Sequence, residues 1–259
     1  MSNIKYRFIY IYLLLFSIST VVYAQPKSIK ISGNVIDDVT HAPIPLATVF
    51  VDGTMIGTTA DSTGAFTIHV NDIHKSLVAS HIGYYPAAIT ISEISRNIIA
   101  LKVREQMLEE VVIRDERLRK QDLIKFKVWF LGTDEWGEKA VLLNDSVLWF
   151  TEDKEGFKAT ADGPLLVNLP ELGYTVQTEL VDFSIRYDRR YNSQVGTILG
   201  YFYFKPYPDG KKSDKYEKNR EDVYFNSSQH FLRALYNKNL DENGFVESSC
   251  LKPCGNFKV

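Results

Sequence analysis

The stretch GTTADSTGAFTI, residues 57–68, decides how the first half of the chain is built. At its centre Asp61 stands three residues before Gly64, and Phe66 and Ile68 then alternate with polar residues. An aspartate accepts hydrogen bonds from backbone N–H groups that follow it, and glycine supplies the positive φ that closes such a turn. We therefore predict a hairpin turn with Phe66 in the core of the next strand. The alternative is a calcium loop, but that needs several oxygen ligands, and the turn contains one carboxylate.

The segments around this turn alternate apolar and polar residues with a period of two. They are residues 28–37, 44–53, 64–70, 75–84 and 96–103, and residues typical of turns, such as Pro43, Pro45 and Asp52-Gly53, separate them. Short alternating segments between turns are typical of a β-sandwich whose sheets are buried on one face.

Five elements in this region occur in the order of a known family. They are Ser32-Gly33-x-Val35, Pro45-Leu46-Ala47-Thr48-Val49, Gly57-Thr58-Thr59, Asp61-x-x-Gly64-x-Phe66 and Ile82-Gly83-Tyr84. Through them, residues 26–104 resemble the carboxypeptidase-regulatory-like domain, a seven-stranded β-sandwich of transthyretin-like topology. The resemblance implies a non-catalytic module, found beside carboxypeptidase catalytic domains and at the N-termini of TonB-dependent outer-membrane receptors.

The histidines do not form the zinc motif of a carboxypeptidase, which pairs His-x-x-Glu with a distant His. None of the five histidines is followed by Glu three residues later; they are His41, His69, His74, His81 and His230. We therefore predict no metal-binding, cofactor-binding or catalytic residue, and no cofactor.

Residues 1–24 have the order of a secretory signal peptide. Lys5 and Arg7 precede an apolar run over residues 8–18, and Val22-Tyr23-Ala24 provides a cleavage site before Gln25. The run is shorter than the roughly 20 residues of a comfortable membrane span, although a retained anchor is the alternative. We expect export to the periplasm or an association with the outer membrane.

The charge and the cysteines limit the partners of the mature chain. The 259 residues carry a formal charge of −2 without a basic block, which argues against a nucleic-acid partner. No second long apolar run follows, so no membrane span is expected in the mature chain. Cys250 and Cys254 lie in a tail over residues 248–259, and the sequence leaves open whether they pair or stay free thiols.

Residues 105–125 join the two halves. Leu108–Ile113 forms a short apolar strand with an acidic start, and a similar patch follows this sandwich in outer-membrane receptors, near the segment read by the energy-coupling protein TonB. Docking by strand addition is therefore one hypothesis, and a final or connecting strand of this chain is the other. Residues 118–130 predict a helix, with a switch to strand at its end left open.

Residues 126–247 predict a β-rich α+β domain with C-terminal helices, which makes the whole chain mainly β. Long strands flank a hairpin over residues 187–196, and two helices follow between residues 212 and 240. The second helix begins at Asn226 or Ser227, and we expect a buried face on it, formed by Phe231, Leu232, Leu235 and Tyr236. The strings GYFYF and NREDVYFNSSQHFLRAL resemble a companion region of Gram-negative carboxypeptidase-like regulatory-domain proteins, and this resemblance assigns no activity to the region.

The main functional hypothesis is an exported, non-enzymatic protein of the bacterial envelope that contacts a protein or a glycan. Trp136, Trp149 and Tyr207 are the candidates for carbohydrate stacking, unless they belong to the core. A second hypothesis is an accessory of TonB-linked uptake, with an outer-membrane receptor or a TonB-type protein as its partner.

The third hypothesis is a hydrolase with its site in the second half. Ser227 and His230 lie three residues apart on one predicted helix face, with Glu221 or Asp222 as an orienting carboxylate. No Gly-x-Ser-x-Gly motif accompanies them. A glycosidase would instead use paired carboxylates, for which the candidates are Glu171, Glu179 and Asp182.

Overall fold

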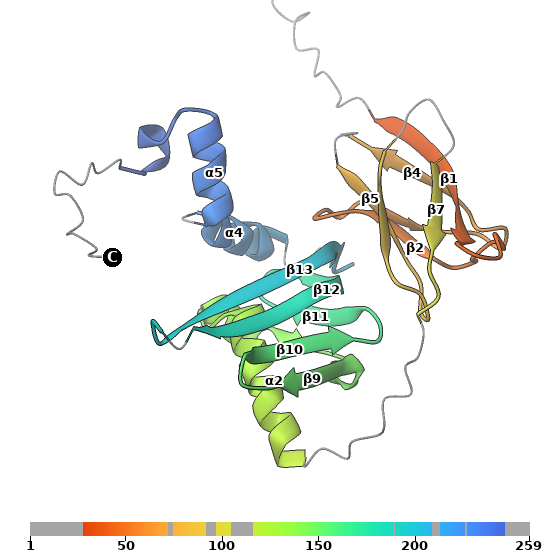
Figure 1. The fold of residues 1–259 in the computed structure, drawn as a ribbon. Helices are drawn as coiled ribbons and strands as arrows, with labels where there is room; N and C mark the ends of the chain where they lie inside the picture. The colour runs from red at the N-terminus through yellow and green to blue at the C-terminus, as the bar shows by residue number, and fades with distance from the viewer. Residues whose placement is uncertain are drawn as a thin grey trace, which may run out of the picture.

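A computed structural model describes residues 28–71, 75–91, 97–104, 116–188, 190–208, 213–225 and 227–246. The order of elements is a run of short strands, a helix, a second group of strands and two C-terminal helices (Figure 1). The predicted mainly β class, with helices at the end of a β-rich second half, is confirmed. Within these ranges, no helix combines the length and the apolar character needed to cross a bilayer.

The first half is a sandwich of two sheets. Its strands in the described residues are β1 (Ile29–Asp37), β2 (Thr48–Val51), β3 (Gly57–Thr59), β4 (Ala65–Val70), β5 (Ser76–Ser80), β6 (Ala87–Thr90) and β7 (Asn97–Leu101). One sheet has the order β4-β1-β7 and the other β3-β2-β5-β6. The first and last strands pair in parallel, with Gly33 opposite Asn97. The strand segments expected from period two are therefore present, and they divide into two layers.

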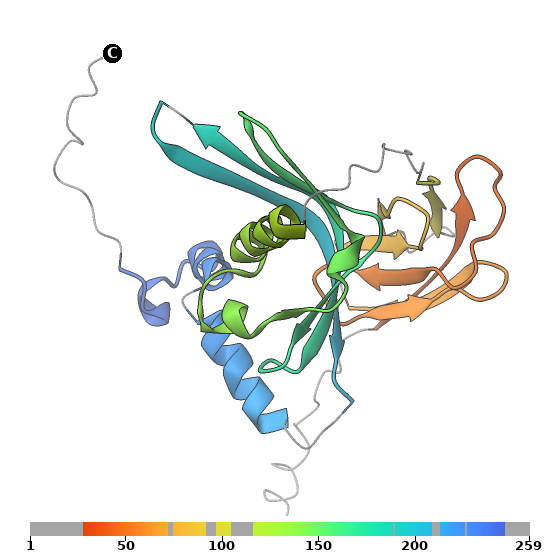
Figure 2. The same cartoon turned by 90° about the horizontal axis from the view of Figure 1, so that it is seen from below.

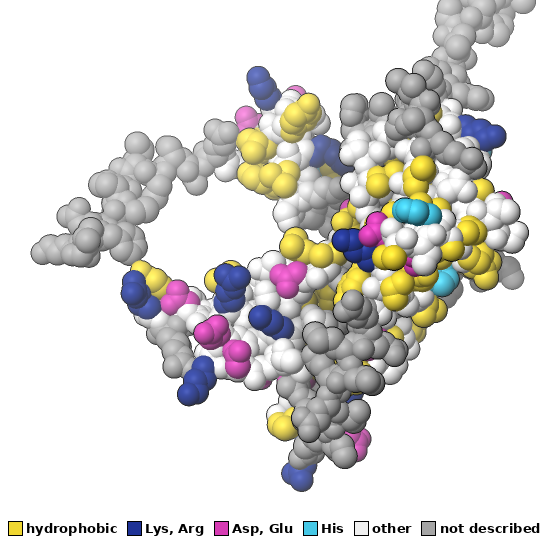
Figure 3. All heavy atoms as spheres, turned by 45° about the vertical axis from the view of Figure 1, so that its right-hand side comes forward, with side chains coloured by type: hydrophobic (Ala, Val, Ile, Leu, Met, Phe, Trp, Pro, Cys, Tyr) yellow, Lys and Arg dark blue, Asp and Glu magenta, His cyan; other side chains and the backbone are white. Residues whose placement is uncertain are grey.

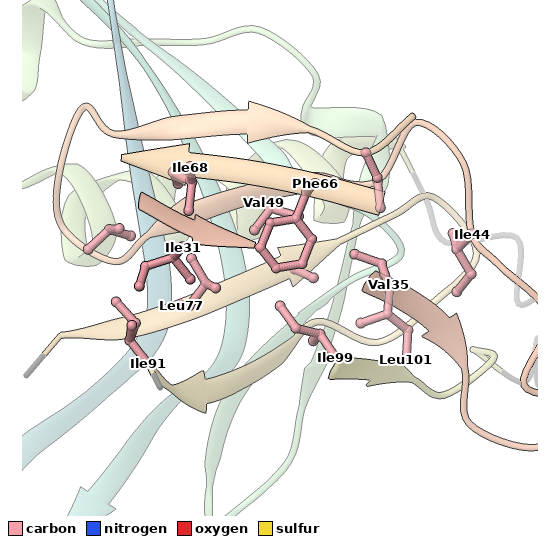
Figure 4. Packing of buried hydrophobic residues seen from close by; sticks show 14 of the residues in the cluster. Ile31, Val35, Ile44, Val49, Phe66, Ile68, Leu77, Ile91, Ile99 and Leu101 are labelled. Atoms are coloured by element: carbon pink, nitrogen blue, oxygen red, sulfur yellow. The ribbon is translucent and has the colours of Figure 1, made fainter. Parts of the chain in front are cut away.

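The core of the sandwich lies between these layers, as the alternation predicts. In β4, Phe66, Ile68 and Val70 are buried, while Thr67 and His69 between them are exposed. Figure 4 shows the Phe66 ring in the middle of the cluster, among side chains of both sheets. Burial of alternate residues from each sheet is what holds two such layers together.

The turn at Asp61 connects the two sheets, so our prediction of a hairpin is wrong. The strand before the turn, β3, pairs with β2, whereas the strand after it, β4, pairs with β1. The turn chemistry itself is confirmed, because Asp61 Oδ1 accepts the N–H of Thr63 at 2.8 Å and the N–H of Ala65 at 3.0 Å. Gly64 closes the turn with φ +71°. The local sequence specified the corner, but the partner of each strand depends on the rest of the sandwich.

The second half forms a six-stranded sheet. The elements of this half up to the end of the sheet are α2 (Glu116–Leu131), α3 (Glu135–Lys139), β8 (Val141–Leu142), η1 (Asp145–Val147), β9 (Leu148–Glu152), β10 (Gly156–Ala161), β11 (Leu165–Leu169), β12 (Tyr174–Asp188) and β13 (Ser193–Pro206). The six strands β8 to β13 form the sheet. The long strand β12 organises this second sheet, because β11 and β10 follow one another along one of its edges and β13 pairs along the other. The predicted long hairpin is therefore present.

Helix α2 covers one face of the second sheet. Phe126 is fully buried, and its ring centroid lies 4.7 Å from that of Phe183 on β12 and 5.9 Å from that of Phe150 on β9. The helix continues to Leu131, so the switch to a strand that the sequence left open does not occur. Figure 2 shows the helices on one side of the second sheet and the sandwich on the other.

The chain ends in α4 (Ser213–Tyr224), α5 (Ser228–Tyr236) and η3 (Asp241–Asn243), which we call the helical end. Helix α4 is anchored at the turn before β12, where the Arg220 guanidinium lies 3.9 Å from the ring centroid of Tyr174. Asn219 Nδ2 also donates to the Glu171 carbonyl at 2.6 Å. Ser227 caps α5, as expected, by accepting the His230 N–H at 3.1 Å.

The predicted buried face of α5 is wrong. Its four residues are exposed, namely Phe231 (41%), Leu232 (60%), Leu235 (48%) and Tyr236 (87%). The side of the helix that packs against the chain carries His230 and Ala234, which are 3% and 2% exposed. Periodicity identified the apolar side of this helix, but it did not reveal that another side packs.

Candidate interaction surfaces and the interdomain junction

The outer face of one sandwich sheet is buried under the second sheet, and we call this contact the junction. Phe50 and Val78 are fully buried although they alternate with the residues of the sandwich core and so point away from it. The Phe50 ring stacks on Tyr203 of β13, with centroids 5.2 Å apart and planes at 15°. Burial raises the pKa of the Tyr203 hydroxyl above its usual value. The stacked rings therefore form an apolar part of the junction.

Backbone pairing fixes the junction. Gly53 donates its N–H to the Phe202 carbonyl at 2.9 Å, and Phe204 donates to the Thr54 carbonyl at 3.0 Å. The Asp52 carboxylate accepts the N–H of Phe202 at 2.8 Å, and Thr54 pairs with Tyr203 as a parallel bridge. The loop of residues 52–54 therefore extends the outer edge of β13 by a short strand-like contact.

A buried carboxylate lies beside this pairing. Glu179 of β12 is 2% exposed, and Ser80 of the sandwich donates its hydroxyl to Glu179 Oε1. Gln177 Nε2 donates to the same oxygen at 3.0 Å, and Lys205 Nζ donates to Gln177 Oε1 at 2.9 Å. Burial of a carboxylate costs free energy unless hydrogen-bond donors surround it. These contacts therefore make Glu179 a specific link between the sandwich and the second sheet.

A second polar contact lies near residue 104. The Arg104 guanidinium donates to the carbonyl of Ala161 at the end of β10, and it also donates to the Tyr84 carbonyl at 3.4 Å. The same guanidinium lies 4.9 Å from the ring centroid of Tyr85. Arg104 therefore provides another contact between the sandwich and the second sheet.

Our sequence reasoning missed the junction, although a signal for it was present. Residues 49–51 and 77–79 are uninterrupted apolar runs inside strands otherwise expected to alternate. A strand that is apolar on both sides is buried on both faces. The runs therefore indicate that something covers the outside of this sheet, although they cannot name β12 and β13 as the cover.

The group around His230 has the geometry of a packed helix cap. Ser227 Oγ donates to the Tyr224 carbonyl at 2.7 Å, and the His230 Nε2 atom lies 3.1 Å from Asn243 Oδ1. The imidazole sits among the rings of Tyr224, Phe225 and Phe245, with centroids 4.9 to 5.4 Å away. Glu221 and Asp222, the proposed orienting carboxylates, are exposed on α4. These contacts account for Ser227 and His230 as structural residues.

The three carboxylates considered for glycosidic chemistry occupy different surroundings. Glu179 is engaged in the junction, as described above. Glu171 forms an ion pair with Lys215 of α4 at 2.8 Å. Asp182 lies directly after Val181, where the pairing of β12 with β13 shifts in register. The structure therefore gives Glu179 and Glu171 roles in packing.

The candidate aromatic residues differ in exposure. Trp149 on β9 is 51% exposed, and its indole N–H donates to Asp162. Trp136 is half-buried beside Lys139, and Tyr207 is half-buried with its hydroxyl on Asn168 Oδ1. Trp149 is thus the member of the three that presents its ring to solvent.

The remaining predicted residues are dispersed. His69 is exposed on β4, His41 lies in a turn with φ +56°, and His81 stands edge-on to Tyr84 with centroids 5.6 Å apart. In the part of the chain that the structure describes, no three His, Cys, Asp or Glu side chains gather to hold a metal ion. The remaining sites lie outside the described residues: His74, Leu108–Ile113, Cys250 and Cys254.

The helical end presents an exposed apolar surface that the sequence pattern did not predict. We call the exposed residues Phe231, Leu232, Leu235 and Tyr236 the α5 face, and Phe225 and Val246 near it are also exposed. Figure 3 shows hydrophobic side chains grouped on this end of the molecule. Contiguous exposed apolar surface in a folded protein marks an interaction site.

Comparison with known proteins concerns the sandwich. Residues 31–113 match the CarboxypepD_reg-like domain, a regulatory rather than a catalytic module. The TonB-dependent receptor P3 of Formosa agariphila is 29% identical over 103 residues, which are 40% of this chain and 10% of the receptor. The match therefore spans about a tenth of the length of that receptor. The predicted carboxypeptidase-like regulatory domain is confirmed, and residues 31–113 carry it.

Proposed function

We propose that this chain is an exported, non-catalytic binding protein of the bacterial envelope. In this proposal residues 1–24 are a signal peptide, residues 26–104 form the regulatory-like sandwich, and residues 126–247 form a second domain. The support comes from the match to a regulatory module, from the resemblance to part of an outer-membrane receptor, and from the structural roles of Ser227, His230 and Glu179.

The exposed α5 face is the observation that carries a binding role. Its four apolar residues lie on one side of a capped helix, while His230 and Ala234 hold the other side against the chain. A helix anchored in this way keeps its apolar side available, and such a face fits into a hydrophobic groove of a protein partner. We propose an envelope protein as that partner.

Site-specific crosslinking in cells tests this role. A photoreactive amino acid at Leu232 should give a defined adduct, and the same amino acid at Lys218, exposed on α4, is the matched control. The Leu235→Ser variant should abolish the adduct at Leu232 while α5 keeps its cap. Equal adducts at both positions, or none at Leu232, would contradict a binding role for the α5 face. N-terminal sequencing of the exported protein should identify Gln25 as its first residue.

A role in TonB-linked uptake is the second candidate, and the receptor resemblance favours it. In this version Leu108–Ile113 adds a strand to an energy-coupling partner. Deletion of residues 108–113 should lower capture of that partner, and the α5 variant Leu235→Ser should leave it unchanged. Unchanged capture by the deletion variant would exclude this docking mode.

Enzyme assays separate binding from the hydrolase alternative. The purified protein should not turn over peptide, ester or glycan substrates. Turnover that disappears in His230→Ala, with an unchanged circular dichroism spectrum, would overturn the non-catalytic proposal. A glycan role without catalysis would instead appear as binding that depends on the exposed Trp149, with the half-buried Trp136 as the control position.

A further inference from the structure

The outer edge of β13 differs from every other sheet edge in the described residues. β13 is 14 residues long, whereas the other edge strands, β3, β4, β6, β7, β8 and β9, have two to six residues. Residues 193–204 of β13 contain no charged residue and no proline; Lys205 and Pro206 come only after them. Soluble proteins usually protect edges with short strands, charges or proline, because a free edge pairs with another chain.

The sandwich covers this edge at one end only. The hydrogen bonds of Phe202 and Phe204 to residues 52–54 show that even-numbered residues of β13 direct their N–H and C=O groups outward. Because these groups alternate along a strand, Gln194, Gly196, Ile198 and Gly200 face the same open side. Among the described residues, no further backbone bond reaches the edge between Gln194 and Gly200. We call this segment the open edge.

We propose that the open edge binds the same segment of a second copy of this chain, in an antiparallel pair about a two-fold axis at Thr197. Gln194 would then pair with Gly200 of the second copy, and Gly196 with Ile198 of the second copy. Each of these pairs joins residues whose backbone groups face outward, which an antiparallel ladder requires. The two second sheets would continue into one sheet, as an isologous contact.

Three features favour a second copy over another partner. The open edge lacks charge, so the two-fold axis brings no like charges together. Val195 and Leu199, 59% and 54% exposed on one face, would cover each other across the axis. The length also fits: the second copy's strand ends at its residue 193, opposite Tyr201, just before the sandwich loop begins at Phe202.

Measurement of the mass in solution tests the pairing. The purified protein should have the mass of two chains by light scattering at micromolar concentration. Thr197→Lys places two ammonium groups at the axis and should reduce the mass to one chain. Thr151→Lys is the matched control, because Thr151 is exposed on β9 at the opposite edge of the same sheet, and it should leave the mass unchanged.

A second variant separates the backbone contact from charge. The Ile198 N–H faces outward, so Ile198→Pro removes a bond of the proposed pair while the ladder with β12 remains. This variant should also have the mass of one chain, with a wild-type circular dichroism spectrum. A dimer that persists in both Thr197→Lys and Ile198→Pro would overturn the proposal, as would a wild-type protein that stays a single chain.

Disulfide trapping tests the register. In an antiparallel pair centred on Thr197, its two copies form a non-hydrogen-bonded pair with Cα atoms about 4.5 Å apart, within the range of a disulfide. Thr197→Cys in a background of Cys250→Ser and Cys254→Ser should therefore crosslink two chains on mild oxidation. Val195→Cys in the same background should not, because its two copies would lie about 13 Å apart along the strands. Equal crosslinking at both positions would overturn the two-fold register.

Discussion

The sandwich and the helical end use their apolar residues in opposite ways. In β4 of the sandwich, Phe66 and Ile68 face inward, and the polar residues between them face water. In α5, Phe231 and Leu232 face water, and the polar His230 is buried among aromatic rings. A periodic pattern therefore defines an apolar side, but a packed neighbour decides whether that side is buried.

The largest expected difference comes from removing one phenyl ring in each region. Phe66→Ala should lower the free energy of unfolding by about 3–5 kcal/mol, because the ring lies in the middle of the sandwich core. Phe231→Ala should cost less than about 1.5 kcal/mol, because that ring is partly in water already. Chemical denaturation followed by circular dichroism measures both. Equal losses would mean that the α5 face is covered in solution.

A buried polar group also stabilises the junction. Glu179→Ala should cost about 2–4 kcal/mol, because it leaves the buried donors of Ser80 and Gln177 without their acceptor. Glu179→Gln retains an acceptor oxygen and should cost less. Asp182→Ala on the same strand is the control, with a change under about 1 kcal/mol. If Glu179→Ala matches that control, the carboxylate does not fasten the two halves.

Substitutions at two glycines distinguish the cost of backbone strain from the cost of steric crowding. Gly64 and Gly53 both have positive φ, at +71° and +67°. A Cβ at Gly64 would lie 2.6 Å from the Val35 carbonyl oxygen, whereas a Cβ at Gly53 would meet no atom within 4 Å. Gly53→Ala should therefore cost about 1 kcal/mol, and Gly64→Ala about 2–3 kcal/mol, by the same denaturation measurement. Similar costs would show that the sandwich relaxes around the corner.

The smallest effect concerns pH. Hydrogen bonds from the Thr63 hydroxyl, and from the N–H groups of Thr63 and Ala65, lower the pKa of Asp61 below its ordinary value. The folded pKa is thus below the unfolded pKa of about 3.9, so the stabilisation is present above the unfolded pKa and is lost as the pH falls through the folded pKa. Asp61→Asn should therefore flatten the decline in melting temperature between neutral pH and acid. An unchanged decline would assign acid sensitivity to other carboxylates.

The sandwich was predictable because its information is local. Turn residues such as Asp61 and Gly64 mark the corners, and the period of two assigns the inward side of each strand. The same local information could not show that the corner crosses between sheets, because strand pairing depends on residues far away in the chain.

The junction and the α5 face were not predictable for a related reason. The apolar residues Phe50 and Val78 indicate that the outer face of their sandwich sheet is buried. The segment that covers this face is β13, about 150 residues later in the chain. On α5, His230 is buried through contacts with Tyr224 and Phe225 at the end of α4 and with Phe245 after η3. The periodicity of a single helix cannot predict such contacts, because they come from residues outside that helix.

The parallel pairing of β1 with β7 has a consequence for the growing chain. The first strand of the sandwich needs the last one as a neighbour, with Gly33 opposite Asn97. A chain emerging from the ribosome or from a translocation pore therefore cannot complete this sheet until residue 101 is free, and closing so large a loop is slow. Until then one edge of β1 stays open to incorrect pairing. The order of the strands therefore delays completion of this sheet. During the delay, the surroundings of the chain determine whether the open edge of β1 pairs incorrectly.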